Sequence, residues 1–158
     1  MTRQRVLFAA MTMVLGAIST SAQTFTDPVT YCRAVGTVDK PGSQYAGPKL
    51  PGWMAAKLNL KPDQANLMEW RCAKGAVFAC VYGANIPCNA KAVISQKATP
   101  AIVEFCRQNP DSTFVPMVVT GHETTVSWTC HDTRPVVTKV GPVDSHGYAK
   151  AYWHRISN

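Results

Sequence analysis

The sequence predicts an α+β fold in which two short helices lie on one small antiparallel sheet of about five strands, with disulfides joining the elements. Two segments begin with a capping residue followed by proline, which is typical of the start of a helix. Several short segments alternate apolar and polar residues between turn signals, as antiparallel strands do. The chain also contains six cysteines, and an even number indicates a disulfide framework in an exported protein.

Residues 1–22 have the pattern of a secretory signal peptide. Arg3 and Arg5 form a positive start, Val6 to Ile18 is an apolar run, and small residues lead up to Ala22. The apolar run is too short for a bilayer span, which needs about 20 residues. We therefore expect cleavage after Ala22, no stable membrane insertion, and a mature protein that is periplasmic or secreted.

Residues 23–158 are expected to form a single α+β domain, because a chain of this length can bury one core. Loss of the leader lowers the net charge from +7 to +5, since it removes Arg3 and Arg5 and no acidic residue. The remaining lysines and arginines are scattered rather than gathered in one block, so we expect no nucleic-acid partner. A basic surface of this kind leaves contact with anionic envelope polymers open, and simple solvation of the charges is the alternative.

The first helix is expected to follow Asp27-Pro28, where Asp27 caps and Pro28 takes the first helical position, and to stop at Gly36. Prolines and glycines then make residues 37–66 largely irregular, apart from a helical turn or two between residues 53 and 60.

A hairpin is expected next. Residues 68–72 alternate as a strand, Lys74-Gly75 signals a turn, and residues 76–82 return as the second strand. Residues 83–89 then form a loop.

The second half begins with the same capping chemistry as the first helix. Thr99-Pro100 starts a helix that runs to about Gln108 and ends before Pro110. Four further strands are expected, at residues 115–119, 124–130, 136–140 and 148–156.

The cysteines are all expected to form disulfides; they are Cys32, Cys72, Cys80, Cys88, Cys106 and Cys130. A two-residue turn at Lys74-Gly75 places Cys72 and Cys80 on opposite faces of the hairpin, which disfavours a bond between them. Cys80–Cys88 is the most plausible local bridge. The helical Cys32 and Cys106 then pair with Cys72 and Cys130, in an order that stays open. No C-x-x-C motif is present, which argues against a zinc or redox site, and no cofactor is expected.

Candidate chemistry is concentrated in the C-terminal third of the chain. His122, Asp144 and His146 lie in predicted turns that can meet at one end of the sheet, where they would form an acid–base or metal site. The alternative is that they are solvated turn residues. No G-x-S-x-G nucleophile motif and no glycine-rich phosphate loop is present.

Several motifs occur in a fixed order along the chain. W-x-C is followed by G-A-N-x-P-C (residues 83–88), F-C-R-x-N-P (residues 105–110), G-H and a second W-x-C. This order resembles small disulfide-rich exported proteins of proteobacteria without an assigned activity, over about residues 31–153. The resemblance implies export and disulfides and carries no catalytic residue. Residues 72–77 (C-x-x-G-x-V) are also similar to a hairpin of periplasmic inhibitors of c-type lysozyme, whose S-G-x-x-Y loop does not occur in this sequence.

The sequence therefore favours an exported non-catalytic module that binds an envelope component or a secreted protein partner. The alternative is a small hydrolase or metal-binding protein that uses His122, Asp144 and His146.

Overall fold

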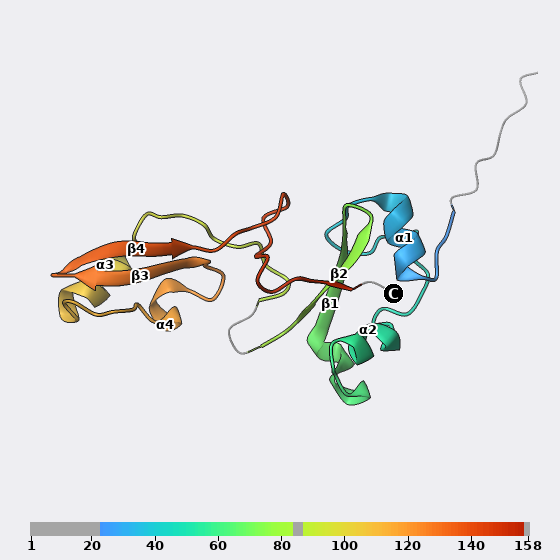
Figure 1. Cartoon of the computed structure of the whole chain (residues 1–158), viewed down its shortest axis with the longest axis horizontal. Helices are drawn as coiled ribbons and strands as arrows, with labels where there is room; N and C mark the ends of the chain where they lie inside the picture. The colour runs from blue at the N-terminus through green and yellow to red at the C-terminus, as the bar shows by residue number, and fades with distance from the viewer. Residues whose placement is uncertain (1–22, 84–86, 157–158) are drawn as a thin grey trace, which may run out of the picture.

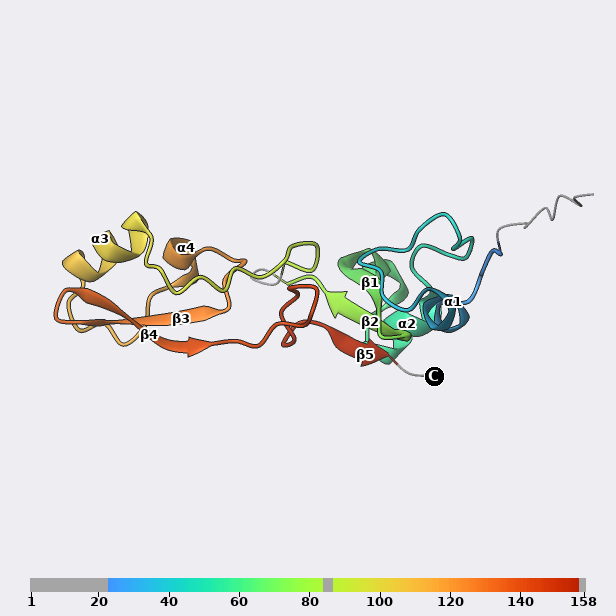
Figure 2. The same ribbon diagram turned by 90° about the horizontal axis from the view of Figure 1, so that it is seen from above.

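The computed structural model describes residues 23–83 and 87–156, so the predicted leader lies outside the described residues. The elements gather into two lobes along an extended molecule (Figure 1; Figure 2). The sheet lobe contains the elements between residues 28 and 81 together with the last strand, residues 154–156, and the hairpin lobe contains the elements between residues 100 and 140. Residues 87–99 and 141–153 run between the lobes and are joined by the hydrogen bond from Ala92 N–H to Gly147 O, 2.8 Å.

The sheet lobe begins with α1 (Pro28–Val35), which the sequence signals place correctly. The side chain of Asp27 accepts a hydrogen bond from the Thr30 N–H, 2.8 Å. The helix ends at Gly36, whose φ of 77° suits glycine.

The sheet of this lobe contains β1 (Met68–Ala73), β2 (Ala76–Val81) and β5 (His154–Ile156) in the order β1-β2-β5, all antiparallel. Lys74 and Gly75 form the predicted two-residue turn, and both have positive φ. This conformation matches the twist of the two strands, which is why tight hairpins favour it.

Two short helical segments precede β1. α2 (Gly52–Lys57) lies where a helical turn was expected, and η1 (Pro62–Leu67) is a 3-10 helix. Within residues 37–66, η1 is the helical segment that was not expected. Pro62 stands at its start, and the fixed φ of proline suits that position.

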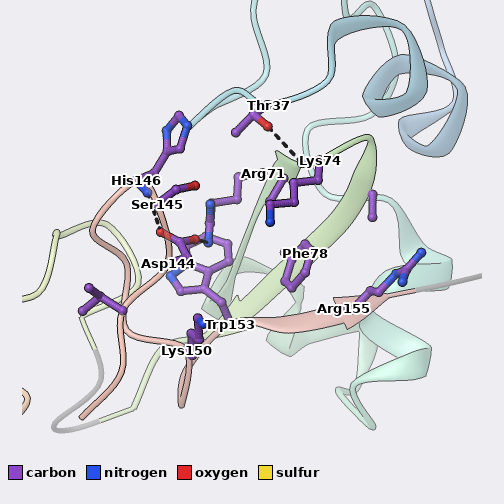
Figure 3. Close-up of a pocket in the computed structure, with 13 residues that line it drawn as sticks. Thr37, Arg71, Lys74, Phe78, Asp144, Ser145, His146, Lys150, Trp153 and Arg155 are labelled. Atoms are coloured by element: carbon purple, nitrogen blue, oxygen red, sulfur yellow. Dashed lines mark hydrogen bonds and ion pairs between the residues drawn. The ribbon is translucent and has the colours of Figure 1, made fainter. Parts of the chain in front are cut away.

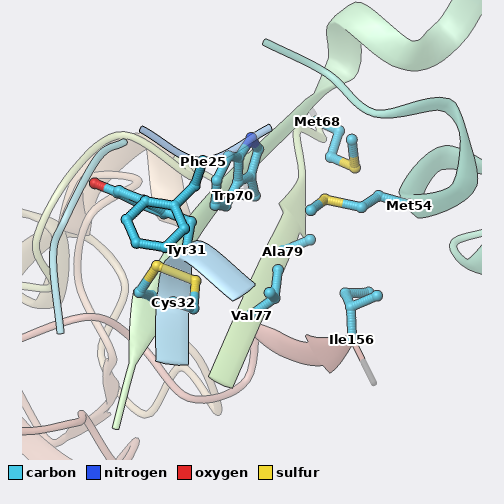
Figure 4. Close-up of a cluster of buried hydrophobic side chains, with 10 residues drawn as sticks. Phe25, Tyr31, Cys32, Met54, Met68, Trp70, Val77, Ala79 and Ile156 are labelled. Carbon is cyan, nitrogen blue, oxygen red and sulfur yellow. A yellow bond between two sulfur atoms is a disulfide. The ribbon is translucent and has the colours of Figure 1, made fainter. Parts of the chain in front are cut away.

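The main core lies between one face of this sheet and the helices α1 and α2 (Figure 4). Trp70 and Tyr31 form its centre, with their ring centroids 6.1 Å apart and nearly perpendicular. The other buried members are Phe25, Cys32, Met54, Met68, Cys72, Val77, Ala79 and Ile156.

The hairpin lobe consists of α3 (Pro100–Gln108), α4 (Met117–Thr120) and the two-stranded sheet of β3 (Val126–His131) and β4 (Arg134–Val140). The predicted Thr99 cap is present, with its side-chain oxygen 3.3 Å from the Ile102 nitrogen. The lobe has a core of its own, composed of Ile102, Cys106, Val115, Val126, Trp128 and Cys130.

The α+β class is confirmed, although the strands of residues 23–83 and 87–156 form sheets of three and two rather than one sheet. The strand predicted at residues 115–119 is wrong, because most of that segment is α4. Pro116 cannot donate a backbone hydrogen bond to a ladder, and α4 follows it directly. The last strand is shorter than predicted, because residues 144–149 form a turn around Asp144 before the chain reaches β5.

The six cysteines form three disulfides, and none is free. The bridges are Cys32–Cys72, Cys80–Cys88 and Cys106–Cys130. The predicted Cys80–Cys88 bridge is therefore confirmed. In the pairing that the sequence left open, each helical cysteine is bonded to a cysteine on a strand of its own lobe. Within the described part of the chain, no helix has the length and apolar character that a bilayer span needs.

Candidate functional site

The sheet of the sheet lobe has a second face, opposite to the core. Alternation along β1 sends Trp70 toward the core and Arg71 to this second face. Phe78 stands opposite Arg71, and Arg155 stands opposite Phe78, so these three side chains form a row across the three strands. A basic and aromatic surface is thereby built directly by the strand register.

The segment between β4 and β5 covers part of this face and is fastened to it by Asp144. One carboxylate oxygen of Asp144 accepts from the backbone N–H groups of His146 and Tyr148, at 2.8 and 3.0 Å, and the other pairs with the Arg71 guanidinium. The imidazole Nδ1 of His146 lies 2.8 Å from the Asp39 carboxylate, which also pairs with Lys91 at 3.3 Å.

Between the segment and the sheet lies a pocket of about 520 Å³, here called the basic pocket (Figure 3). Phe78, Val143 and Trp153 supply apolar lining. The ionisable lining residues are Arg71, Lys74, Asp144, His146, Lys150 and Arg155.

Arg71 is the buried group of this pocket, with 2% of its surface exposed. Its guanidinium carbon lies 4.4 Å from the ring centroid of Tyr148 and 4.6 Å from that of Trp153, which favours the cation. Asp144 accepts from Nη2, but the buried Nε and Nη1 have no hydrogen-bond partner among the described residues. Buried N–H groups are ordinarily paired, so these two donors stand out.

The basic pocket has an excess of positive charge. Asp144, its one acidic lining residue, is already paired with Arg71. Lys74, Lys150 and Arg155 have exposed side chains, and none forms an ion pair with an acidic group of residues 23–83 or 87–156. Three cations at the mouth of one pocket create a local field that attracts anions.

The carboxylates that fasten the covering segment are held in their charged forms. Burial by itself raises the pKa of Asp144, but hydrogen bonds from Tyr148, Arg71 and His146 outweigh it and leave the pKa below its ordinary value. The pKa of Asp39 is lowered in the same way, since hydrogen bonds from His146 and Lys91 outweigh the effect of burial.

The structure brings together two of the three predicted site residues. Asp144 and His146 line the basic pocket, whereas His122 follows α4 in the hairpin lobe, is exposed, and does not line it. Among the described residues, no group of three or more His, Cys, Asp and Glu side chains could hold a metal ion.

Sequence reasoning missed Arg71, Lys74 and Arg155 as members of a site. Arg71 reads as an ordinary polar residue of an alternating strand. Phe78 is the residue from which the site could have been predicted. The two-residue turn places this aromatic residue opposite Arg71, on the face of the hairpin that was expected to be polar. An aromatic residue on that face indicates that something covers it.

No protein-family model matches this chain, and neither a curated protein nor a solved structure is significantly similar to it.

Proposed function

We propose that the protein is an exported, non-catalytic binding module that takes an anionic group of an envelope component into the basic pocket. One observation carries the proposal: three cations that pair with no acidic group of the described residues line a pocket built around the buried Arg71. Lysine and arginine are the side chains that ordinarily bind carboxylate and phosphate groups, which suits this role.

The arrangement around Asp144 and His146 supports binding rather than hydrolysis. A general acid or base needs freedom to exchange its proton with a substrate. Asp144 is engaged by Arg71 and two backbone N–H groups, and His146 is engaged by Asp39. Both side chains therefore fasten the covering segment and help to shape the pocket.

Export is supported by the disulfides and by the leader pattern. All six cysteines are paired, which is typical of proteins of an oxidising compartment. The leader and the motif order similar to small exported proteins point to the same compartment.

Charge reversal at the pocket mouth tests the proposal. Mature protein with its disulfides formed would be titrated with oligogalacturonate, which offers carboxylates, and with oligomeric glycerol phosphate, which offers phosphates. Lys150→Glu combined with Arg155→Glu should weaken binding by about tenfold or more, since each lost contact of an exposed ion pair is worth up to about 1 kcal/mol. Both side chains are exposed, so the fold should tolerate the change.

The matched control is Lys97→Glu combined with Lys139→Glu, which gives the same net charge with two exposed lysines that do not line the basic pocket. Binding by the control should stay within about threefold of the unaltered protein and should weaken from about 20 to 150 mM salt. The proposal is wrong if neither anion binds, or if both double variants lose affinity equally. The anion that binds more tightly identifies the charged group.

A further inference from the structure

A second groove, of about 530 Å³, runs along β1, an edge strand of the three-stranded sheet, where Met68, Glu69 and Trp70 line it. We call it the edge groove, and it is lined by aromatic side chains and by a mixed set of polar ones. It shares no lining residue with the basic pocket. It therefore requires its own explanation, which the proposed function does not supply.

The aromatic wall of the edge groove is held rigidly. Tyr45 and Trp70 pack edge to face, with ring centroids 4.9 Å apart. Each ring is fixed by its polar atom: the Tyr45 hydroxyl donates to the Pro48 carbonyl at 3.0 Å, and the Trp70 indole N–H donates to the Lys49 carbonyl at 2.8 Å. Rings held in this way form a preorganised surface, which lowers the entropic cost of binding.

Gly47 allows the Tyr45 ring to take this position. A Cβ atom at Gly47 would lie 2.1 Å from the Thr26 carbonyl oxygen and 2.5 Å from the Tyr45 hydroxyl oxygen. Only glycine fits here, so the shape of the wall depends on this residue.

The polar side of the groove is built on the Glu69–Tyr82 pair. The Tyr82 hydroxyl donates to one carboxylate oxygen of Glu69 at 2.6 Å. Burial and the neighbouring carboxylate raise the pKa of Tyr82 to about 12, so the phenol keeps its proton at neutral pH. The second carboxylate oxygen of Glu69 has no partner among the described residues, and the exposed Asn66 side chain adds a donor and an acceptor.

The charges of this groove favour a ligand without a strong charge of its own. Glu69 disfavours an anion beside it, and the exposed Lys40 and Lys49 disfavour a cation. What remains is a neutral molecule with many hydroxyl groups, which can both donate to Glu69 and accept from lysine and asparagine, while its C–H surface contacts the tyrosine ring.

We propose that the edge groove binds a neutral saccharide, with Tyr45 against the sugar ring and Glu69, Tyr82 and Asn66 on its hydroxyl groups. The groove is a binding site rather than a hydrolytic one. Glycoside hydrolysis ordinarily uses two carboxyl groups flanking the bond, and Glu69 is the one carboxylate among the residues that line this groove.

Titration with defined tetrasaccharides tests the proposal. Chitotetraose, cellotetraose and maltotetraose are the neutral probes, and tetragalacturonate is the acidic one, with tryptophan fluorescence and calorimetry as readouts. We expect at least one neutral probe to bind below about 1 mM. Tyr82→Phe keeps the ring and removes the hydroxyl, and it should weaken that binding by about fivefold, the effect of one hydrogen bond. Asn66→Ala should act in the same direction.

Asn89→Ala is the matched control, because Asn89 is exposed and does not line the groove. It should bind the neutral probe as the unaltered protein does. The Lys150→Glu, Arg155→Glu variant should also keep this binding, which separates the present proposal from the one on the basic pocket. The inference is overturned if no neutral probe binds at about 10 mM, if only tetragalacturonate binds, or if Tyr82→Phe and Asn66→Ala leave affinity unchanged.

Discussion

The substitution Asp144→Asn removes the negative charge next to the buried Arg71 guanidinium and can keep the other hydrogen bonds of this side chain. Asparagine keeps a side-chain oxygen that can accept from the His146 and Tyr148 N–H groups. The Arg71 guanidinium, with 2% of its side chain exposed, would then be left as a buried charge without a counterion. The substitution therefore measures what the ion pair contributes to stability.

The expected loss is about 2 to 3 kcal/mol of unfolding free energy. Removing one partner of a fully buried pair costs about 3–5 kcal/mol. The loss here should be smaller than in that case, because the side chain of Asp144 is 21% exposed, so water reaches one partner, and because Tyr148 and Trp153 still stabilise the cation. Arg71→Met removes the cation and keeps much of its volume, and its cost should be about 1 to 2 kcal/mol, since Asp144 can be hydrated.

Urea unfolding of the two single variants and the double variant gives the coupling energy. The double variant should be about as stable as Arg71→Met, which corresponds to a coupling of about 2 kcal/mol. A coupling below about 0.5 kcal/mol would refute the reasoning, because it would mean that the pair does not fasten the covering segment.

The difference in unfolding free energy between Asp144→Asn and the unaltered protein should also depend on pH. The pKa of Asp144 is lower in the folded protein than its ordinary value of 3.8, so its contribution is complete above about pH 4 and is lost as the pH falls through the folded-state pKa. Asp144→Asn should therefore be closest in stability to the unaltered protein at the most acidic pH. Unfolding curves at neutral pH and at successively lower pH values below 3.8 check the sign, because the difference between the two proteins should shrink as the pH falls.

Two further predictions concern the hairpin lobe. The first replaces both cysteines of the Cys106–Cys130 bridge by serine. Because the bridge joins residues 24 positions apart, its loss should lower the free energy of unfolding by about 3 kcal/mol. Equal denaturation midpoints with and without the bridge would contradict this. The second is Thr125→Val, which should leave the free energy of unfolding unchanged or raise it by up to about 1 kcal/mol. The reason is that the buried Thr125 hydroxyl has no hydrogen-bond partner among the described residues. A loss above about 1 kcal/mol would show that this hydroxyl forms a hydrogen bond in the folded protein.

Local sequence signals predicted the local structure well. The two capped helices begin where Asp27 and Thr99 indicated, since an N-cap depends on residues only three positions apart. The two-residue turn at Lys74-Gly75 fixed the register of β1 and β2, and it correctly kept Cys72 and Cys80 apart.

Long-range features were harder to predict. That the strands form two sheets depends on where the connections between the lobes run, and no local pattern encodes that. The basic pocket joins Arg71 of β1 to Asp144, which lies 73 residues further along the chain. Asp144 and His146 were recognised as candidate site residues together with His122. Their partners Arg71 and Asp39 come from a strand and a loop that the sequence does not link to them.

Mapping of the bound anion onto the protein tests the central claim most directly. Oligogalacturonate and oligomeric glycerol phosphate would each be titrated into labelled mature protein, with the backbone amide and tryptophan indole signals followed by NMR. We expect the largest changes at Trp153, Lys150 and Lys74, around the buried Arg71, and small changes throughout the hairpin lobe. Changes that are largest at Trp128 and its neighbours, or signals that move for neither anion, would contradict the account of the basic pocket.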